Sequence, residues 1–204
     1  MKSSVLTLAG AMVAAGLVVA APAQAEPFNG PFVGVQAGWN HNDIGTLDGD
    51  LGVVDVDRSK DSAAGGVFAG YDHKIGSSVV LGVEAGFNMG IDDKMTRRRG
   101  AVDTTVNPLH AFDVSARAGY LVNDRSLIYV RGGYDNMSAR TTLVSPDLAV
   151  SSKDSYDGWM VGGGFERALG DKVSTRLEYR YSDLGSDAAK FDRHQVLLGV
   201  AYRF

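Results

Sequence analysis

Apolar and polar residues alternate most clearly in the last eleven residues of the chain, 194–204. Every second residue there is apolar or aromatic, and the set is Val196, Leu198, Val200, Tyr202 and Phe204. Because successive side chains of a β-strand lie on opposite faces, this pattern predicts a strand with one wholly apolar face. In a barrel embedded in lipid, hydrocarbon covers such a face, and pairing of the last strand with the first leaves no free edge.

Similar alternation recurs in seven earlier segments, at about 31–40, 65–73, 78–88, 110–121, 126–136, 157–168 and 173–182. Short turns at 74–77, 122–125 and 169–172 separate some of them, and longer polar segments at 41–64, 89–108, 137–156 and 183–190 separate the others. In membrane barrels the short turns face the periplasm and the long loops face outward. The pattern therefore predicts an all-β fold, an eight-stranded antiparallel up-and-down transmembrane β-barrel.

The first 25 residues have the organisation of a cleavable signal peptide. Lys2 precedes an uncharged apolar stretch, and Ala23-Gln24-Ala25 offers the small residues that a signal peptidase reads. Pro22 argues against the alternative of a membrane-spanning helix. We expect cleavage before Glu26, which leaves 26–204 as one barrel domain.

Composition limits the chemistry of the chain. Its 20 Lys and Arg residues against 24 Asp and Glu residues give a net charge of −4, a balance that speaks against a nucleic-acid partner. There is no cysteine, so the chain has neither disulfide bonds nor thiol chemistry. We expect no cofactor.

Four segments carry a resemblance to a known family: 32–38 (FVGVQAG), 158–166 (GWMVGGGFE), 176–181 (RLEYRY) and 201–204 (AYRF). With them the chain resembles the small eight-stranded outer-membrane β-barrels, a family that includes OmpA-type transmembrane domains and opacity-type surface proteins. The resemblance implies a location in the cell outer membrane and recognition of the terminal strand by the barrel-assembly machinery. Since the sequence ends on the last predicted strand, we do not expect the peptidoglycan-anchoring role of longer OmpA-type proteins to apply to this chain.

Charged residues of the predicted strands fall on the face that points into the barrel. They are Glu84, Asp113, Arg117, Arg131, Glu166, Arg176, Glu178, Arg180 and Arg203. The interior of an eight-stranded barrel is just wide enough for side chains to fill, and interleaved arginines and carboxylates satisfy one another there. We predict a polar plug, with a gated ion path as the alternative. Glycines at 34, 38, 82, 86, 119, 162 and 164 are expected to make room for these long side chains.

Two charge clusters fall in the predicted outer loops. Lys94, Arg97, Arg98 and Arg99 are candidates for contact with lipopolysaccharide phosphates, because arginine suits phosphate geometry. A host polyanion is an alternative ligand, and a solvated charge cluster is the alternative without a ligand. The first loop holds aspartates at 43, 48, 50, 55, 57 and 61, but their spacing departs from a calcium-binding loop. We expect a disordered acidic loop and no metal site.

An enzyme is the less favoured class. Some eight-stranded barrels modify lipid, which requires a nucleophile and a base on the outer wall. His194 is predicted to face outward, yet its neighbour on that face is Val196 rather than a serine. His41 is placed in a loop, His73 at a turn and His110 at a strand start, so no histidine pair with metal-ligand spacing is expected. A soluble lipocalin-like barrel is also disfavoured, since it would bury the apolar face and expose the charged one.

We therefore expect a monomeric outer-membrane barrel with a plugged interior and no catalytic residues. Its expected work is structural and interfacial: it supports the envelope, contacts lipopolysaccharide and presents loops to host, phage or neighbouring cells. The first alternative is a narrow channel of low conductance, and the second is a lipid A-modifying enzyme.

Overall fold

The computed structural model describes residues 26–49, 52–91, 94–99, 102–145, 148–185 and 191–204. The predicted signal peptide, 1–25, lies outside the described residues. No helix in the described part of the chain is long and apolar enough to cross a membrane.

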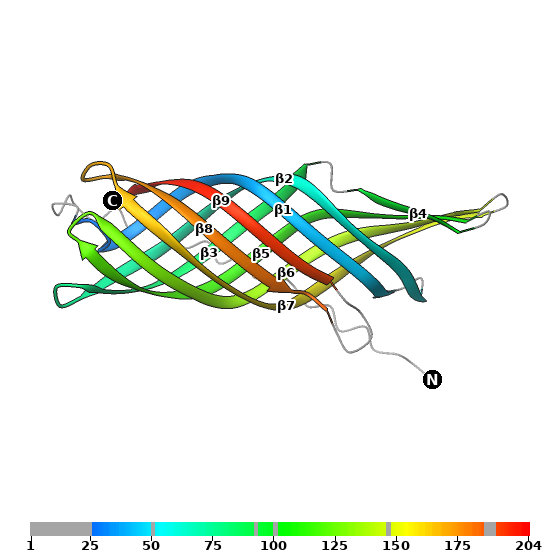
Figure 1. The fold of residues 1–204 in the computed structure, drawn as a ribbon, viewed down its shortest axis with the longest axis horizontal. Helices are drawn as coiled ribbons and strands as arrows, with labels where there is room; N and C mark the ends of the chain where they lie inside the picture. The colour runs from blue at the N-terminus through cyan, green and yellow to red at the C-terminus, as the bar shows by residue number, and fades with distance from the viewer. Residues whose placement is uncertain (1–25, 50–51, 92–93, 100–101, 146–147, 186–190) are drawn as a thin grey trace, which may run out of the picture.

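Nine antiparallel strands build the fold (Figure 1). They are β1 (Gly30–Gly49), β2 (Gly52–Ile75), β3 (Val79–Ile91), β4 (Met95–Arg99), β5 (Val102–Asn123), β6 (Ser126–Ser145), β7 (Leu148–Ala168), β8 (Val173–Asp183) and β9 (Phe191–Arg203). β1 pairs with both β2 and β9, and β3 pairs with β5, so the sheet closes into a ring. β4 continues beside β5 where β3 has ended. Eight strand positions thus surround the barrel, and β3 and β4 share one of them. The prediction of an antiparallel barrel is confirmed, with one position split into two strands.

The two faces of the sheet have opposite chemistry. Val83 exposes 59% of its surface on the outer wall, whereas Glu84, the next residue, exposes 3%. Alternation of this kind runs along every strand of the ring, because successive side chains leave opposite faces of a strand. The apolar face points outward and the charged face points into the lumen.

The predicted long loops at 41–64, 89–108 and 137–156 are largely wrong. Most of these residues continue the strands of the barrel as paired hairpins. The disordered acidic loop is wrong for the same reason, since aspartates 43, 48, 55, 57 and 61 lie on β1 or β2, while residue 50 is outside the described residues. Strand pairing in water leaves both faces free to be polar, so the period-2 apolar signal disappears although the backbone ladder continues.

One part of the sheet projects beyond the rest at the end opposite the short turns (Figure 1). It consists of β4 and the outer parts of β5, β6 and β7 (95–99, 102–110, 137–145 and 148–157), and we call it the projecting sheet. The last pair of β7 with β8 is Trp159 with Asp183, so β7 continues past its neighbour. The inner face of the projecting sheet contributes to a buried apolar cluster at the outer mouth of the lumen: Met95, Val106, Ala111, Met137, Ala139, Tyr156, Leu184 and Phe191.

A second apolar cluster closes the short-turn end of the lumen. It contains Phe28, Val80, Leu121, Leu127, Tyr129 and Ala168. Phe28 is fully buried, adopts a φ of 63° and lies under the guanidinium of Arg203, 4.7 Å from its ring centroid. At the rim the Lys74 ammonium donates to Glu26 at 2.8 Å, and this bond lowers the pKa of the Glu26 carboxyl. The first described residues therefore cover this mouth.

Candidate functional site

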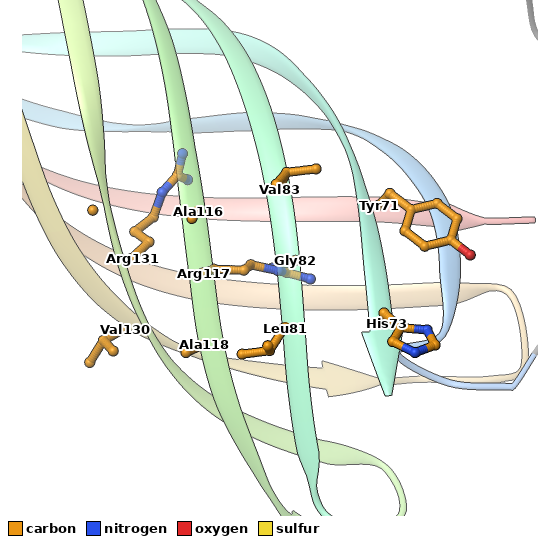
Figure 2. A pocket seen from close by; sticks show the side chains of 11 residues that line it. Tyr71, His73, Leu81, Gly82, Val83, Ala116, Arg117, Ala118, Val130 and Arg131 are labelled. Atoms are coloured by element: carbon orange, nitrogen blue, oxygen red, sulfur yellow. The ribbon is translucent and has the colours of Figure 1, made fainter. Parts of the chain in front are cut away.

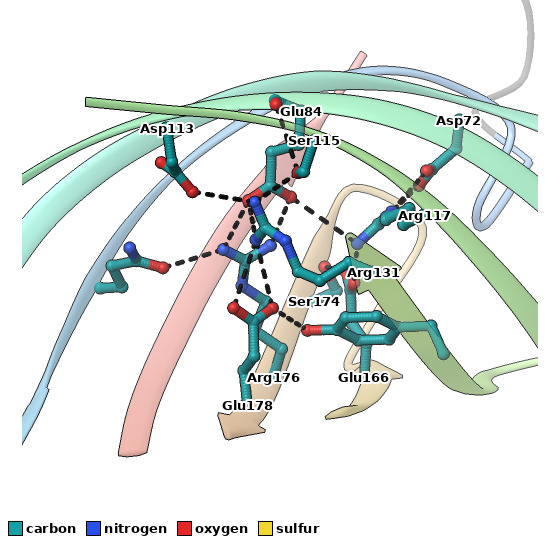
Figure 3. Close-up of polar contacts among 12 residues, drawn as sticks. Asp72, Glu84, Asp113, Ser115, Arg117, Arg131, Glu166, Ser174, Arg176 and Glu178 are labelled. Atoms are coloured by element: carbon teal, nitrogen blue, oxygen red, sulfur yellow. Dashed lines mark hydrogen bonds and ion pairs between the residues drawn. The ribbon is translucent and has the colours of Figure 1, made fainter. Parts of the chain in front are cut away.

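The centre of the lumen is a network of arginines and carboxylates (Figure 3). Glu84 on β3 accepts a bond of 2.6 Å from Arg176 Nη1 and one of 2.7 Å from Arg131 Nη1. Arg117 Nη1 lies 3.8 Å from the same carboxylate. All four side chains are at most 2% exposed. Three guanidinium groups from different strands thus neutralise one buried charge.

Two further carboxylates complete the outer part of the network. Glu178 accepts from Tyr129 Oη at 2.6 Å, from Arg180 Nε at 3.0 Å and from Arg131 Nη1 at 3.2 Å. Asp113 Oδ1 accepts from Arg131 Nη2 and Arg180 Nη1, each at 3.0 Å. Arg131 therefore joins all three acidic groups.

Nearer the short turns, a second layer holds Arg117 and Arg203 between Asp72 and Glu166. Arg117 bonds the Asp72 carboxylate and donates to Glu166 Oε2 at 3.1 Å. Arg203 donates to Asp72 Oδ2 at 2.8 Å and to Glu166 Oε1 at 2.6 Å. Ser174 Oγ donates to Glu166 Oε1 at 2.6 Å.

The structure places all nine residues that the sequence assigned to the lumen inside it, each at most 4% exposed. Sequence reasoning missed Asp72, although Tyr71 faces outward and the alternation of the strand puts its neighbour inside. The alternation puts Gln36 and Ser115 on the inward face, but sequence reasoning did not include them in the charged network. Gln36 accepts from Arg176 Nη2 at 2.8 Å, and Ser115 accepts from Arg131 Nη2 at 2.6 Å. Their signal is the same alternation, applied to uncharged polar residues.

Several glycines make room for the network. A Cβ added to Gly86 would overlap the Asp113 carboxylate, and one at Gly82 would overlap Asp72. A Cβ at Gly164 would lie 2.7 Å from Tyr129 Oη. At Gly38 it would instead overlap the backbone of β9, so that glycine serves close approach of strands rather than lumen packing.

This arrangement fills the lumen with paired charges. A general acid or base needs a carboxyl group that can meet a substrate, whereas each carboxylate named here is bonded to at least one arginine. Apolar clusters lie at both ends of the network. Among the described residues, no group of three or more acidic or histidine side chains gathers in a geometry that could hold a metal ion.

His194 lies on the outer wall, as its alternation predicts. Its Nδ1 is 2.8 Å from Tyr179 Oη, and its ring centroid lies 6.3 Å from that of His41. His41 is not in a loop: it lies on β1 directly opposite His194, and its Nδ1 is 2.7 Å from Asp61 Oδ1. The prediction that His41 lies in a loop is therefore wrong, because this segment is part of β1. His194 contacts His41 and two tyrosines rather than a serine within the described part of the chain.

Between the short turns and the projecting sheet the outer wall is mainly apolar. The terminal-strand residues Val196, Leu198, Val200, Tyr202 and Phe204 all point outward with exposures of 42–59%. A groove of about 660 Å³ runs over β2, β3, β5 and β6, with Tyr71 and His73 at one end (Figure 2). Leu81, Val83, Ala116, Ala118 and Val130 line most of the rest of it. Arg117 and Arg131 also border the groove, but their side chains are buried in the lumen, so the chemistry of the groove matches hydrocarbon rather than a polar substrate.

The predicted basic cluster lies on or beside β4. Lys94 and Arg98 are exposed, and Arg98 Nε lies 3.5 Å from Asp103 Oδ1. The structure describes only the backbone of Arg97 and Arg99, which pair with Thr104 and Val102 of β5. Because Asp103 is nine residues beyond Phe112, the outermost aromatic of β5 on the wall, Arg98 stands about 30 Å further along the tilted strand.

Comparison with known proteins gives a consistent result. The sequence model of the outer membrane protein beta-barrel domain matches residues 10–204. The 31 kDa outer-membrane immunogenic protein of Brucella melitensis is 28% identical, over the full length of both chains. The 22 kDa outer membrane protein of Rhizobium leguminosarum bv. viciae is 30% identical, over 87% of this chain and 78% of that protein.

Solved structures share the fold at low identity. Ail of Yersinia pestis, solved with the heparin analogue sucrose octasulfate, covers 86% of this chain and 99% of its own at a TM-score of 0.50 and 15% identity. OprG of Pseudomonas aeruginosa covers 88% of this chain and 98% of its own at a TM-score of 0.50 and 11% identity.

Proposed function

Because this chain belongs to the outer membrane protein beta-barrel domain family, we propose that it is a sealed, non-catalytic surface barrel that supports the envelope and contacts lipopolysaccharide. The outer membrane is its location. The observation that carries the proposal is the closed lumen. Arginine–carboxylate bonds cross its centre, and an apolar cluster lies at each end. What this molecule offers its surroundings is its apolar wall and its projecting sheet.

The sealed state distinguishes this proposal from the narrow channel. A conducting path would have to separate Glu84 from Arg131 and Arg176, which leaves buried charges without partners. We expect the purified protein in planar bilayers to give no steady discrete openings. Regular unitary openings would contradict a sealed lumen and favour the channel.

Contact with lipopolysaccharide is assigned to the basic residues at β4, namely Lys94, Arg97, Arg98 and Arg99. Arginine binds phosphate through two parallel hydrogen bonds, and the side chains of Lys94 and Arg98 are exposed at the projecting sheet, where an anion can reach them. Replacing the three arginines by glutamine should weaken binding of purified lipopolysaccharide and leave the barrel folded. A triple variant that folds and binds as tightly as the original chain would end this assignment.

The remaining parts of the proposal follow from the wall. The terminal strand, with its outward Tyr202 and Phe204, is proposed to be read by the barrel-assembly machinery, and the barrel is proposed to act as a monomer.

A deletion strain tests the physiological role, because sensitivity to detergent reports envelope support and loss of attachment reports adhesion. An intact detergent barrier after deletion would remove the structural role.

A catalytic role is tested on the same wall. Assay of the purified protein for lipid deacylation and palmitoyl transfer should give no turnover above background. Turnover that disappears in His194→Ala would identify an enzyme.

A further inference from the structure

The outward face of the projecting sheet carries a row of hydroxyl groups across all four of its strands. Thr96 lies opposite Thr105, Thr105 lies opposite Thr142, and Thr142 lies opposite Ser151. The Oγ1 atoms of Thr96 and Thr105 are 3.0 Å apart, and Thr142 Oγ1 donates to Ser151 Oγ at 3.3 Å. Since the opposite face belongs to the apolar cluster at the outer mouth, the row faces away from the barrel axis.

A second row, two residues closer to the barrel, is cationic. Arg140 on β6 lies directly opposite Lys153 on β7, and both side chains are exposed. Asn107 on β5 lies opposite Arg140 on the other side. Like charges directly opposite each other across a strand pair destabilise it. An anion bound between Arg140 and Lys153 would relieve their repulsion.

Together the two rows form a flat polar surface, which we call the hydroxyl–cation face: Thr96, Thr105, Thr142, Ser151, Arg140 and Lys153. Neighbouring strands repeat at about 4.8 Å, so donors recur at regular intervals across it. Hydroxyl groups exchange hydrogen bonds with the hydroxyls of a sugar, and a guanidinium fork matches the oxygens of a phosphate. The chemistry fits a saccharide that carries phosphate groups.

The height of the hydroxyl–cation face above the aromatic girdle indicates which saccharide it meets. Thr142 lies eight residues beyond Tyr134, the outermost aromatic of β6 on the wall, which is about 25 Å of tilted strand. Aromatic girdles mark the depth of the lipid headgroups. A face above that level that points sideways meets the sugars of neighbouring lipids rather than their headgroup phosphates.

We propose that the hydroxyl–cation face binds the phosphorylated core saccharide of the surrounding lipopolysaccharide. This inference rests on the proposed contact with lipopolysaccharide and names the part of that ligand which is recognised. Arg140 and Lys153 hold the phosphate, and the hydroxyl row orients the sugars.

The test uses the folded protein in lipid nanodiscs and three soluble probes: deacylated core oligosaccharide, the same oligosaccharide without its phosphates, and heparin. Vesicles that contain intact lipopolysaccharide provide the fourth arm. The variants are Arg140→Gln with Lys153→Gln, and Thr142→Val with Ser151→Ala. Arg125→Gln with Lys172→Gln is the matched control, because it removes two exposed cations at the opposite end of the barrel. Heat-modifiable gel mobility verifies that each variant is folded.

We expect the phosphorylated core to bind, and the cation variant to lose about tenfold or more in affinity, since each charge-assisted hydrogen bond is worth 1.4 kcal/mol or more. The hydroxyl variant should lose less, and the control should bind unchanged. Equal binding of the dephosphorylated core, or unchanged binding by the folded cation variant, would overturn the inference. Heparin that binds more tightly than the core would overturn the assigned source.

The arm with intact lipopolysaccharide separates this inference from the proposed function. Binding of those vesicles that depends on the three arginines of β4 and is unchanged in the Arg140 and Lys153 variant, together with no binding of the isolated core, would refute the inference and keep the contact with lipopolysaccharide. Loss of binding in every arm would refute both.

Discussion

The lumen and the outer wall of this barrel are built from alternate residues of the same strands, yet they are stabilised by different physics. Glu84 meets three arginines in fixed geometry, whereas Val83, its neighbour, meets lipid hydrocarbon that imposes no geometry. In the lumen each charged group therefore has specific partners, and the loss of one partner should destabilise the barrel. On the wall a change of side-chain shape should have little effect on stability, whereas a new charge should destabilise the barrel. Four changes test this contrast, from the largest expected effect to the smallest.

Glu84→Ala should have the largest effect. It removes the carboxylate shared by Arg131 and Arg176 and leaves buried positive charge, at a cost of about 3–5 kcal/mol of unfolding free energy. Urea unfolding in detergent or lipid, followed by tryptophan fluorescence, measures the change. Asp124→Ala in an exposed turn is the control and should leave the midpoint in place. Equal midpoints for the two variants would show that the network is not stabilising.

Val83→Arg addresses the wall. Val83 lies midway along the apolar part of β3, so an arginine there should lower the unfolding free energy by about 2–4 kcal/mol. Val144→Arg is the matched control, because Val144 is 45% exposed and points outward on the projecting sheet. That control should change stability little. If both arginines destabilised the barrel equally, the position of the lipid belt inferred from the wall would be wrong.

Gly86→Ala returns to the lumen with a smaller change. The added methyl group would overlap the Asp113 carboxylate, which Arg131 and Arg180 hold in place, so overpacking should destabilise by about 1–3 kcal/mol. Gly170→Ala is the control, because no atom lies within 4 Å of its added Cβ. A neutral result at Gly86 would indicate that the network can shift as a unit.

Glu26→Gln should have the smallest effect, since Glu26 is exposed and its bond to Lys74 is screened by water. The pKa of Glu26 is lower in the folded chain than its ordinary value of 4.5. Its contribution is therefore present above that value and is lost as the pH falls towards the folded pKa. The difference between the original chain and the variant should be small at about pH 7 and disappear in acid. A difference that grows as the pH falls would contradict the ion pair.

The part of the fold inside the lipid belt could be predicted from the sequence because lipid forces a strict alternation. Val79 to Phe87 on β3 shows it without an exception, and it fixes which neighbours face the lumen. The nine charged lumen residues follow from that rule. The rule cannot predict which arginine bonds which carboxylate. Arg176 bonds Glu84 across the lumen, and that partner is set by the curvature and register of the barrel rather than by the strand that carries Arg176.

The projecting sheet could not be predicted, because its outward face lies in water and lipid does not force apolar residues onto it. Thr105 and Thr142 face water on one side and Val106 and Thr141 face a small apolar cluster on the other, so the apolar period is broken by threonine on both faces. These hairpins are extended by backbone hydrogen bonds, which do not depend on the identity of the side chains and so leave no pattern in the sequence. The register that aligns four hydroxyl-bearing residues across four strands becomes visible only in the structure.

The seam between β1 and β9 has a kinetic consequence. It joins the beginning of the described chain to its end, so the ring is completed by contacts of the largest possible sequence separation. Loop-closure entropy makes such contacts slow to form. Every intermediate before closure is an open sheet with two unpaired edge strands. Before closure the unpaired strand edges favour aggregation, and after closure we expect unfolding to be cooperative and slow.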